Sequence, residues 1–456
     1  MPAILKHILL MLLCLAGGTV LALYLVPGEL EQMRWEISGM PESYPLEQKC
    51  RPILLLLLCY LPFLGILVYS FMGTMDRYVS RTYINYFILC TAILLLIYML
   101  ADFTDNMERF RSRFDDPLRQ ALIFYGSQLP MFLYQILPYT LMMGTLWSLS
   151  KLSGTSELTG MLQSGRSLLR VCMPVFIFAA FGATAYGIFG FHWAPNGSLY
   201  RQMLLKQERS VTNNTAAASI IYRSDAHARI WRIQNPASFQ DPGAPMRHVT
   251  IEQFKKDSRG ELLCQYIADS AVWNKEKATW VLHNTYIRHM APTGQRPPDE
   301  EFADTLELPF DEKPYQIIAP AQNMRIDSLG TSVLYEFLKT GSGSREDRFN
   351  YRTEWHMRIA RIFSCMILVL LAFPCSITFQ RRSPMKGIGI AVLLATLMLF
   401  LYRVFPSLGQ SGLVQAWISA WIPNFIYLSI AFWFIKKNLS HRSVKEWIIA
   451  KLHGRP

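Results

Sequence analysis

The chain has few charged residues and lacks the motifs of common energy-using enzymes. Asp, Glu, Lys and Arg make up 17% of its 456 residues, whereas soluble domains usually carry about a quarter. It contains no Gly-x-x-x-x-Gly-Lys-Ser/Thr phosphate loop and no His-Glu-x-x-His zinc motif. A Ser/His/Asp triad is recognised by geometry, so the sequence alone does not exclude one. We expect no catalytic residue, cofactor or metal site, and any uphill movement would draw its energy from a partner or an ion gradient.

Cysteine is too scarce and too poorly spaced to build a framework. Eight cysteines occur, and six of them lie in or beside apolar runs. Only Cys50 and Cys264 lie in polar segments, and their spacing matches neither a zinc site nor a set of disulfides. We interpret the cysteines as small apolar residues that fill space between larger ones.

Long apolar runs are what the sequence has in abundance. Apolar residues make up 51% of the chain. A run of ~18 or more such residues can cross the ~30 Å hydrocarbon core of a membrane as a helix. A buried core helix could account for one block but not for eight, so the sequence predicts an α-helical membrane protein with about eight transmembrane helices. The blocks are Ile8–Val26, Pro52–Met72, Ile84–Ala101, Ala121–Ser150, Val171–Trp193, Ile362–Phe379, Gly387–Leu401 and Leu413–Ile435.

Basic residues gather in short segments beside these blocks. The formal net charge is +12, which in other proteins can indicate nucleic-acid binding. Here the excess lies in Thr74–Arg81, in Gln380–Lys386 and in the tail after Ile435. An even number of predicted spans separates these segments, so the positive-inside rule places all three, and both termini, in the cytoplasm. We expect a membrane partner and no nucleic acid.

The first block has two interpretations. Lys6 precedes an apolar stretch, as in a cleavable signal peptide. The stretch is longer than a usual signal core, however, and no clear small-x-small cleavage site ends it. We therefore favour an uncleaved membrane anchor over residues 1–26.

A polar insert separates the first five blocks from the last three. Residues 194–355 contain no long apolar run, and short β-rich segments alternate with Pro, Gly and Asp clusters. We expect an antiparallel β-domain, a sandwich or jellyroll, then a short helix at Ser328–Lys339 capped by Ser328. The predicted strands are Ala228–Gln234, Arg247–Phe254, Leu262–Trp273 and Thr279–His289.

The loop between the fourth and fifth blocks can form a short amphipathic helix. Thr155 is a plausible N-cap, and Glu157 in the first turn suits the positive end of the helix dipole. Leu158, Met161 and Leu162 make a short apolar stripe. The helix could lie along the membrane surface, or it could couple the membrane part to a cytoplasmic ATPase.

Several motifs in order resemble the LptF/LptG (YjgP/YjgQ) family of lipopolysaccharide export permeases, and this loop supplies one of them. The resemblance covers about residues 75–440 and leans towards the LptG type. It implies that the helix at about 153–168 is a coupling helix. The similar segments are Met75–Asp105, Gly126–Pro130, Leu137-Pro138, Ser156–Gly165, Trp193–Pro195 and Arg382–Gly387.

The resemblance implies a function and a set of partners. In the family, two homologous permeases, LptF and LptG, each supply six membrane spans and a periplasmic β-jellyroll. A cytoplasmic ATPase, LptB, uses ATP to drive them, so lipopolysaccharide leaves the bacterial inner membrane and passes to a periplasmic bridge of LptC/LptA-like jellyroll proteins. By match, Glu157 would pair with a basic residue of the ATPase, with Ser156, Leu158 and Met161 around it.

The expected organisation departs from the family at two places. An extra transmembrane hairpin occupies 1–74, before helices three to five (75–193), the periplasmic β-jellyroll (194–355), helices six to eight (356–440) and a basic cytoplasmic tail (441–456). At positions where the family often has lysines outside its first span, this chain has Asp102 and Glu108 and keeps only Arg109. Arg109, with Arg111 and Arg113 nearby, is therefore the candidate contact for lipid phosphates, or these residues form an ordinary solvated loop.

Two other functions compete with export. A membrane-anchored scaffold would use the β-domain to bind a periplasmic partner without transport. An ion-driven transporter would need ionisable residues in its spans, and the predicted spans have almost none. Arg403, near the outer end of the seventh span, is such a residue, but it could equally reach the membrane surface by snorkelling.

Overall fold

The computed structural model describes most of the chain. The described residues are 2–39, 45–113, 117–191, 220–224, 227–235, 244–255, 262–274, 279–290, 299–310, 345–377 and 385–439, with isolated residues between 193 and 201, at 277 and between 312 and 338. The basic tail over 441–456 and the predicted cap Ser328 lie outside them.

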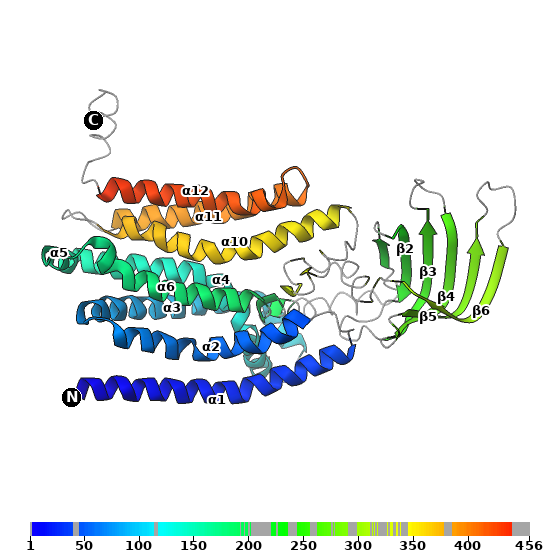
Figure 1. The fold of residues 1–456 in the computed structure, drawn as a ribbon, viewed down its shortest axis with the longest axis horizontal. Coiled ribbons are helices and arrows are strands. Elements are labelled where there is room, and N and C mark those ends of the chain that lie inside the picture. Colours follow the sequence, from blue (N-terminus) through cyan, green and yellow to red (C-terminus); the bar gives the residue numbers. More distant parts are fainter. Residues whose placement is uncertain are drawn as a thin grey trace, which may run out of the picture.

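In the described part of the chain, eight long helices run side by side as a bundle, and one short helix lies at its end (Figure 1). Successive long helices alternate in direction, as the predicted spans require. The helices are α1 (Pro2–Gly39), α2 (Pro45–Phe71), α3 (Thr74–Arg113), α4 (Pro117–Gly154), α5 (Glu157–Gln163), α6 (Leu168–Phe191), α10 (Arg345–Ser376), α11 (Met385–Gln410) and α12 (Ala416–Leu439).

Seven of the described helices are long and apolar enough to cross a membrane: α1, α2, α3, α6, α10, α11 and α12. The remaining predicted span, Ala121–Ser150, forms α4, which lies among these helices. This helix contains polar residues such as Gln128, Thr140 and Thr145, and their side chains are buried inside the bundle. A helical membrane protein is therefore confirmed.

A six-stranded antiparallel sheet forms the domain between α6 and α10. Its strands pair in sequence order, each with the next. The four predicted strands correspond to β2 to β5 within one residue at each end, whereas β1 and β6 were missed. The strands are β1 (Ile220–Ser224), β2 (Arg229–Asn235), β3 (Met246–Phe254), β4 (Leu262–Asn274), β5 (Thr279–His289) and β6 (Asp299–Leu308). The inserted β-domain is confirmed, and a jellyroll is seen only in part, because the described strands make one consecutive sheet.

A crease crosses four strands of this sheet and curves it. The pairing between neighbouring strands skips one residue in each of them: His248, Asp269, Asn284 and Asp304. The backbone φ is +51° at both His248 and Asn284. At the crease the inward-facing position moves by one residue in each strand. Since all four strands shift together, one side stays apolar across the bend. That side holds the core of the domain, which includes Trp231, Trp273 and Trp280.

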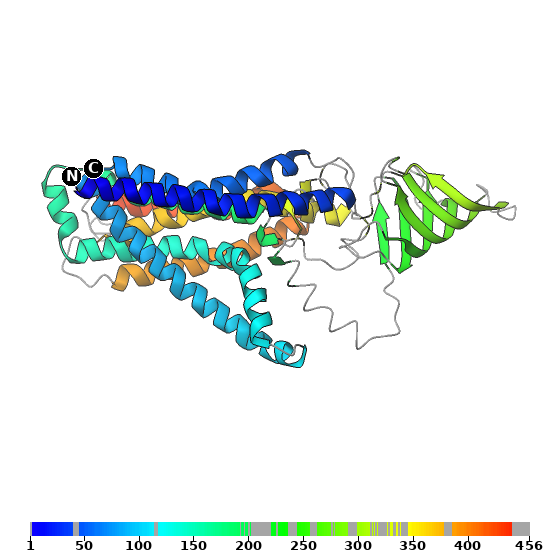
Figure 2. The same ribbon diagram turned by 90° about the horizontal axis from the view of Figure 1, so that it is seen from below.

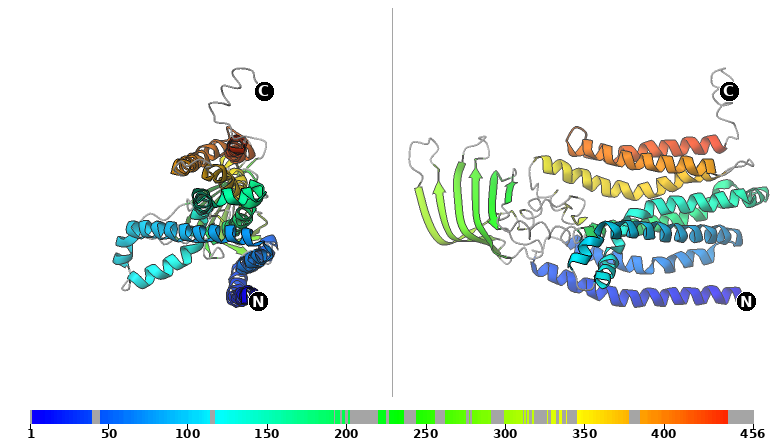
Figure 3. Two further views of the ribbon diagram at one scale, coloured as in Figure 1. Left: turned by 90° about the vertical axis from the view of Figure 1, so that its left-hand side faces the viewer. Right: turned by 180° about the vertical axis from the view of Figure 1, so that it is seen from behind.

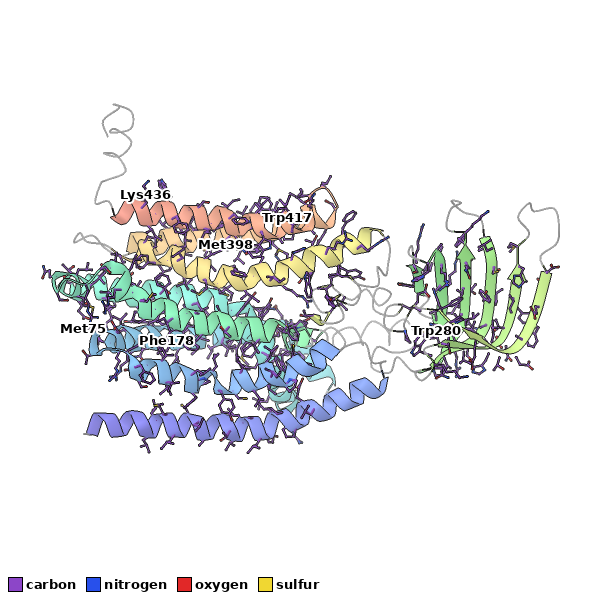
Figure 4. The ribbon with its side chains drawn as sticks, viewed as in Figure 1. Met75, Phe178, Trp280, Met398, Trp417 and Lys436 are labelled. Atoms are coloured by element: carbon purple, nitrogen blue, oxygen red, sulfur yellow. The ribbon has the colours of Figure 1, made fainter. Side chains whose placement is uncertain are left out.

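The sheet and the short helix α5 lie at opposite ends of the bundle. In Figure 1 the sheet is at the right, whereas α5, the start of α1 and the end of α12 are at the left. Figure 4 places Met75 and Lys436 at the α5 end and Trp417 toward the sheet end. A membrane around the bundle would separate α5 from the sheet.

The helix α10 packs against several neighbouring helices, whereas part of α3 leans away from the bundle (Figure 2). The helix α10 packs against α4, α6, α11 and α12, whereas α1 packs on α2 (Figure 3). The sheet-facing half of α3 leans away from the bundle together with the start of α4 (Figure 2). Pro130 and Pro138 lie inside α4, and a proline within a helix removes a hydrogen bond and bends the axis.

Candidate functional site

The short helix α5 begins and ends with sharp turns of the backbone. Ser156, which precedes it, has a left-handed φ of +62°, and Gly165, which follows it, has a φ of +83°. These turns reverse the chain between α4 and α6 and leave α5 lying across the end of the bundle (Figure 1). Within the segment predicted as a coupling helix, about 153–168, the structure has a short helix at Glu157–Gln163, and the segment overlaps the end of α4 and the start of α6.

The predicted N-cap was wrong. The Thr155 hydroxyl donates to the Lys151 carbonyl over 2.9 Å, so Thr155, which directly follows α4, bonds back to that helix instead of capping α5. Ser156 takes the cap position, and its side chain makes no capping hydrogen bond. Because Glu157 stands in the first turn, its carboxylate still lies near the positive end of the helix dipole.

The apolar stripe of α5 is buried in the chain's own core. Leu158 and Met161 are 1% and 7% exposed, and they pack with Leu149, Leu152 and Val79 at the end of the bundle. Burying two such side chains favours this position by roughly 1.5–3 kcal/mol each. Leu158 and Met161 therefore hold α5 in place, and the surface left for a partner is the opposite one.

Ser156 and Glu157 lie on the accessible part of α5. Ser156 is exposed and Glu157 is half-buried, while Thr159, Gly160 and Gln163 are exposed beside them. The Glu157 side chain interacts with the hydroxyl of Tyr78 in α3. This half-buried carboxylate can accept hydrogen bonds from a basic side chain of another protein.

The candidate lipid contacts lie at the other end of α3. Arg109, Arg111 and Arg113 belong to its last turns, and their side chains lie outside the described residues. Asp102, one turn or more earlier, is buried. It forms an ion pair with Arg201, and it accepts a hydrogen bond from the Tyr125 hydroxyl over 3.0 Å. Asp102 therefore binds α3 to α4 and to the chain after α6.

An ion cluster in α10 was missed by the sequence analysis. Glu354 is 7% exposed and lies 3.4 Å from Nε of Arg358 and 3.2 Å from Nη1 of Arg361. All three residues precede the predicted block Ile362–Phe379, which itself contains no Asp, Glu, Lys or Arg, because α10 begins upstream of that block. The spacing of four and seven residues, which puts all three on one helix face, was the signal for it.

The two arginines of this cluster differ in exposure. Arg358 is 9% exposed, whereas Arg361 is 31% exposed. Arg403 on the adjacent α11 is exposed. Near the sheet end of the bundle, Arg361 and Arg403 thus supply positive charge that a single Glu354 does not neutralise.

The sheet is fixed to the segment that follows it. Nη1 of Arg229 lies 2.8 Å from Oε2 of Glu312, and its guanidinium stacks 3.8 Å from the centre of the Phe310 ring. The Trp280 indole donates to the Glu312 carbonyl over 2.6 Å. Burial raises the pKa of Tyr266, which packs against the same Phe310 ring, and the neighbouring Cys264 raises it further. Among the described residues, no cluster of His, Cys, Asp and Glu could hold a metal.

Comparisons with known proteins match this chain to a single family of membrane permeases. The family described as lipopolysaccharide export system permease LptF/LptG matches residues 77–437. The lipopolysaccharide export system permease protein LptG of Haemophilus influenzae is 22% identical over 80% of this chain and 99% of its own length. The corresponding protein LptF of Escherichia coli K12 is 24% identical over 70% of this chain and 82% of its own length. The match begins after α2, so the hairpin of α1 and α2 lies outside the family core.

Proposed function

Because this chain belongs to the lipopolysaccharide export permease family LptF/LptG, we propose that it is the transmembrane permease subunit of an ATP-driven exporter. Its substrate is lipopolysaccharide in the bacterial inner membrane, which it passes toward a periplasmic bridge. The chain carries out transport, and ATP is hydrolysed by a separate LptB-like cytoplasmic subunit.

The observation that carries this proposal is the separation of α5 from the sheet. They lie at opposite ends of the bundle, so a membrane around the bundle puts them on opposite sides. With the basic end of α12, which includes Lys436 and Lys437, on the cytoplasmic side, the positive-inside rule gives a cytoplasmic α5 and a periplasmic sheet. An ATPase then reaches α5, and a periplasmic partner reaches the sheet.

The chemistry of the substrate explains why both ends are needed. Each CH₂ of an acyl chain taken from a bilayer into water costs ~0.8 kcal/mol, so lipid extraction needs an apolar path and an energy source. The helices supply apolar faces, such as Leu96, Ile97 and Leu100 on α3. The energy enters through α5, where Glu157 pairs with a basic residue of the ATPase.

The exporter needs a second permease and a periplasmic acceptor. A homologous LptF/LptG-type chain pairs with this one, and the lipid moves between them. The β-domain passes it to an LptC/LptA-like jellyroll protein. Arg109, Arg111 and Arg113 remain the proposed contacts for lipid phosphates, and their place at the sheet end of α3 supports that role.

A charge reversal at Glu157 tests the proposal. The full chain is co-expressed with its ATPase and partner permease, and the complex is purified and placed in lipid nanodiscs. Glu157→Arg should abolish co-purification of the ATPase and the stimulation of ATP hydrolysis by lipopolysaccharide. The reason is that the new arginine would face the basic residue of the ATPase. The control Glu157→Asp keeps the charge and should retain both.

The alternative is a membrane-anchored scaffold whose β-domain binds a periplasmic partner without transport. The separate sheet, with its own core around Trp231 and Trp280, is the feature that favours it. Unchanged complex formation and unchanged growth with Glu157→Arg would support this alternative against export.

A further inference from the structure

Three consecutive residues at the start of α3 contact three different parts of the chain. We call Asp76, Arg77 and Tyr78 the α3 junction. Only Met72 and Gly73 separate α3 from the end of α2, so the junction adjoins the N-terminal hairpin directly.

The middle residue of the junction binds the end of α2. The last carbonyl groups of a helix have no partner within the helix and need an outside donor. Arg77 provides one: its Nη2 donates to the Ser70 carbonyl over 2.5 Å, and its Nε donates to the Tyr69 carbonyl over 3.3 Å. A charged donor makes these bonds stronger than neutral ones.

The outer two residues of the junction bind the two ends of α5. Nη1 of Arg166, three residues beyond the end of α5, lies 2.9 Å from Oδ1 of Asp76. Tyr78 interacts with Glu157, the first residue of α5. The adjoining Val79 is buried in the cluster that contains Leu158 and Met161. The start of α3 therefore contacts the chain just after α5 through Asp76 and the apolar side of α5 through Val79.

The N-terminal hairpin of α1 and α2 is held together by its own contacts and packs against the rest of the bundle. Glu29 of α1 and Arg51 of α2 form an ion pair of 2.7 Å, in which Arg51 is buried and Glu29 is largely buried. At Gly18 a Cβ would lie 2.9 Å from the Cys59 carbonyl oxygen, so the two helices touch through their backbones. The helix α2 in turn packs on α6. Because α1 and α2 are joined in this way, a shift of the hairpin would displace the end of α2 and, with it, Arg77.

We propose that the α3 junction transmits the position of the N-terminal hairpin to α5, so that Asp76 and Arg77 are positioning residues for the coupling helix. This inference rests on the proposed function in taking α5 as the segment that the ATPase moves. It assigns a role to α1 and α2, which precede the part of the chain that the family matches.

Hydrogen–deuterium exchange of the full chain in lipid nanodiscs, without ATPase, tests the junction. Arg166→Gln breaks the Asp76 ion pair, and Arg77→Met removes the donors to α2. We expect backbone exchange in Glu157–Gln163 to rise roughly threefold in both variants, because Arg166→Gln removes a partly exposed ion pair and Arg77→Met removes hydrogen bonds from a charged donor, each of which stabilises only modestly. Arg166→Lys should restore exchange to near the wild-type rate.

Matched controls separate a local effect from a general one. Arg170→Gln and Arg81→Gln remove exposed arginines from α6 and α3 at the same end of the bundle, and each should leave α5 unchanged. A double-mutant cycle of Asp76→Asn with Arg166→Gln should be non-additive. In the ATPase complex, Arg166→Gln should reduce lipopolysaccharide stimulation roughly threefold and keep the ATPase bound.

Two results would overturn the inference. Exchange in α5 equal to wild type in both Arg77→Met and Arg166→Gln would show that the junction does not hold α5. A rise confined to the end of α2 in Arg77→Met would show that the hairpin and α5 are independent. If α5 loosens as expected but Glu157→Arg leaves the ATPase bound, the proposed function fails and the junction stands.

Discussion

Arg358 donates a hydrogen bond from Nη1 to the Thr331 hydroxyl over 2.8 Å. Its Nη2 donates to the Leu329 carbonyl over 2.5 Å. The Thr331 hydroxyl donates to the carbonyl of Phe191, at the end of α6, over 2.7 Å. One arginine of α10 thus joins the chain that enters the β-domain to the chain that leaves it. We interpret this link as the element that keeps the sheet at a fixed end of the bundle.

Loss of the Arg358 guanidinium should destabilise the protein strongly. Arg358→Met leaves the Thr331 and Leu329 oxygens without their charged donor and takes one partner from buried Glu354. Breaking a buried pair in this way costs about 3–5 kcal/mol. Thermal unfolding of the purified chain in detergent should show a clear fall in midpoint. Arg403→Met, at an exposed arginine of α11, should change stability by less than about 0.5 kcal/mol; equal effects of the two variants would contradict the assignment.

Close contact between α3 and α4 depends on one glycine. At Gly144 an added Cβ would lie 3.0 Å from the Cα of Phe87, and a backbone atom cannot move aside as a side chain can. We expect Gly144→Ala to separate the helices and lower the unfolding midpoint. At Gly126 in the same helix an added Cβ meets nothing within 4 Å, so Gly126→Ala should hold or raise the midpoint. The same unfolding assay compares them, and a harmless Gly144→Ala would disprove the contact.

The sequence was sufficient for the long helices and the central strands because their signals are local. Apolar runs located the spans, and strands β2 to β5 are rich in β-branched and aromatic residues. The strand β1 has only five residues, and β6 carries Asp299, Glu300 and Glu301 at its start, so neither has the composition of a buried strand. They form because neighbouring strands offer them hydrogen-bond partners.

The site was predictable only where it depends on neighbours in sequence. Glu157 and the apolar stripe followed from helical spacing. The pair of Asp76 and Arg166 joins residues 90 positions apart, so no local pattern contains it. The burial of Leu158 and Met161 depends likewise on how α3, α4 and α6 pack. The roles assigned to Glu157 and Ser156 toward an ATPase stay predictions.

The indole of Trp280 should matter for its N–H group as well as for its size. Trp280→Phe keeps an aromatic ring and leaves the Glu312 carbonyl without its donor, which costs about 1–3 kcal/mol for a buried group. Trypsin should then cleave the β-domain of the full chain several times faster. Trp417→Phe also removes an indole N–H, but that side chain is exposed and bonds Gln415 at the surface, so cleavage should keep its wild-type rate. Equal rates in the two variants would refute a structural role for the Trp280 bond.

The crease in the sheet should depend on the backbone preference of Asn284. Its φ of +51° is in the left-handed region, which asparagine and glycine tolerate and β-branched residues do not. We expect the free energy of unfolding of Asn284→Gly to stay within about 0.5 kcal/mol of wild type and that of Asn284→Val to fall by about 2 kcal/mol. Glu301→Val, on the adjacent strand β6, controls for the added apolar surface and should cost little. At Asn284 the inward-facing positions of β5 shift by one residue, so a straightened β5 would turn either Leu282 or Ile287 outward. An unchanged stability in Asn284→Val would mean that packing, rather than the backbone, maintains the bend.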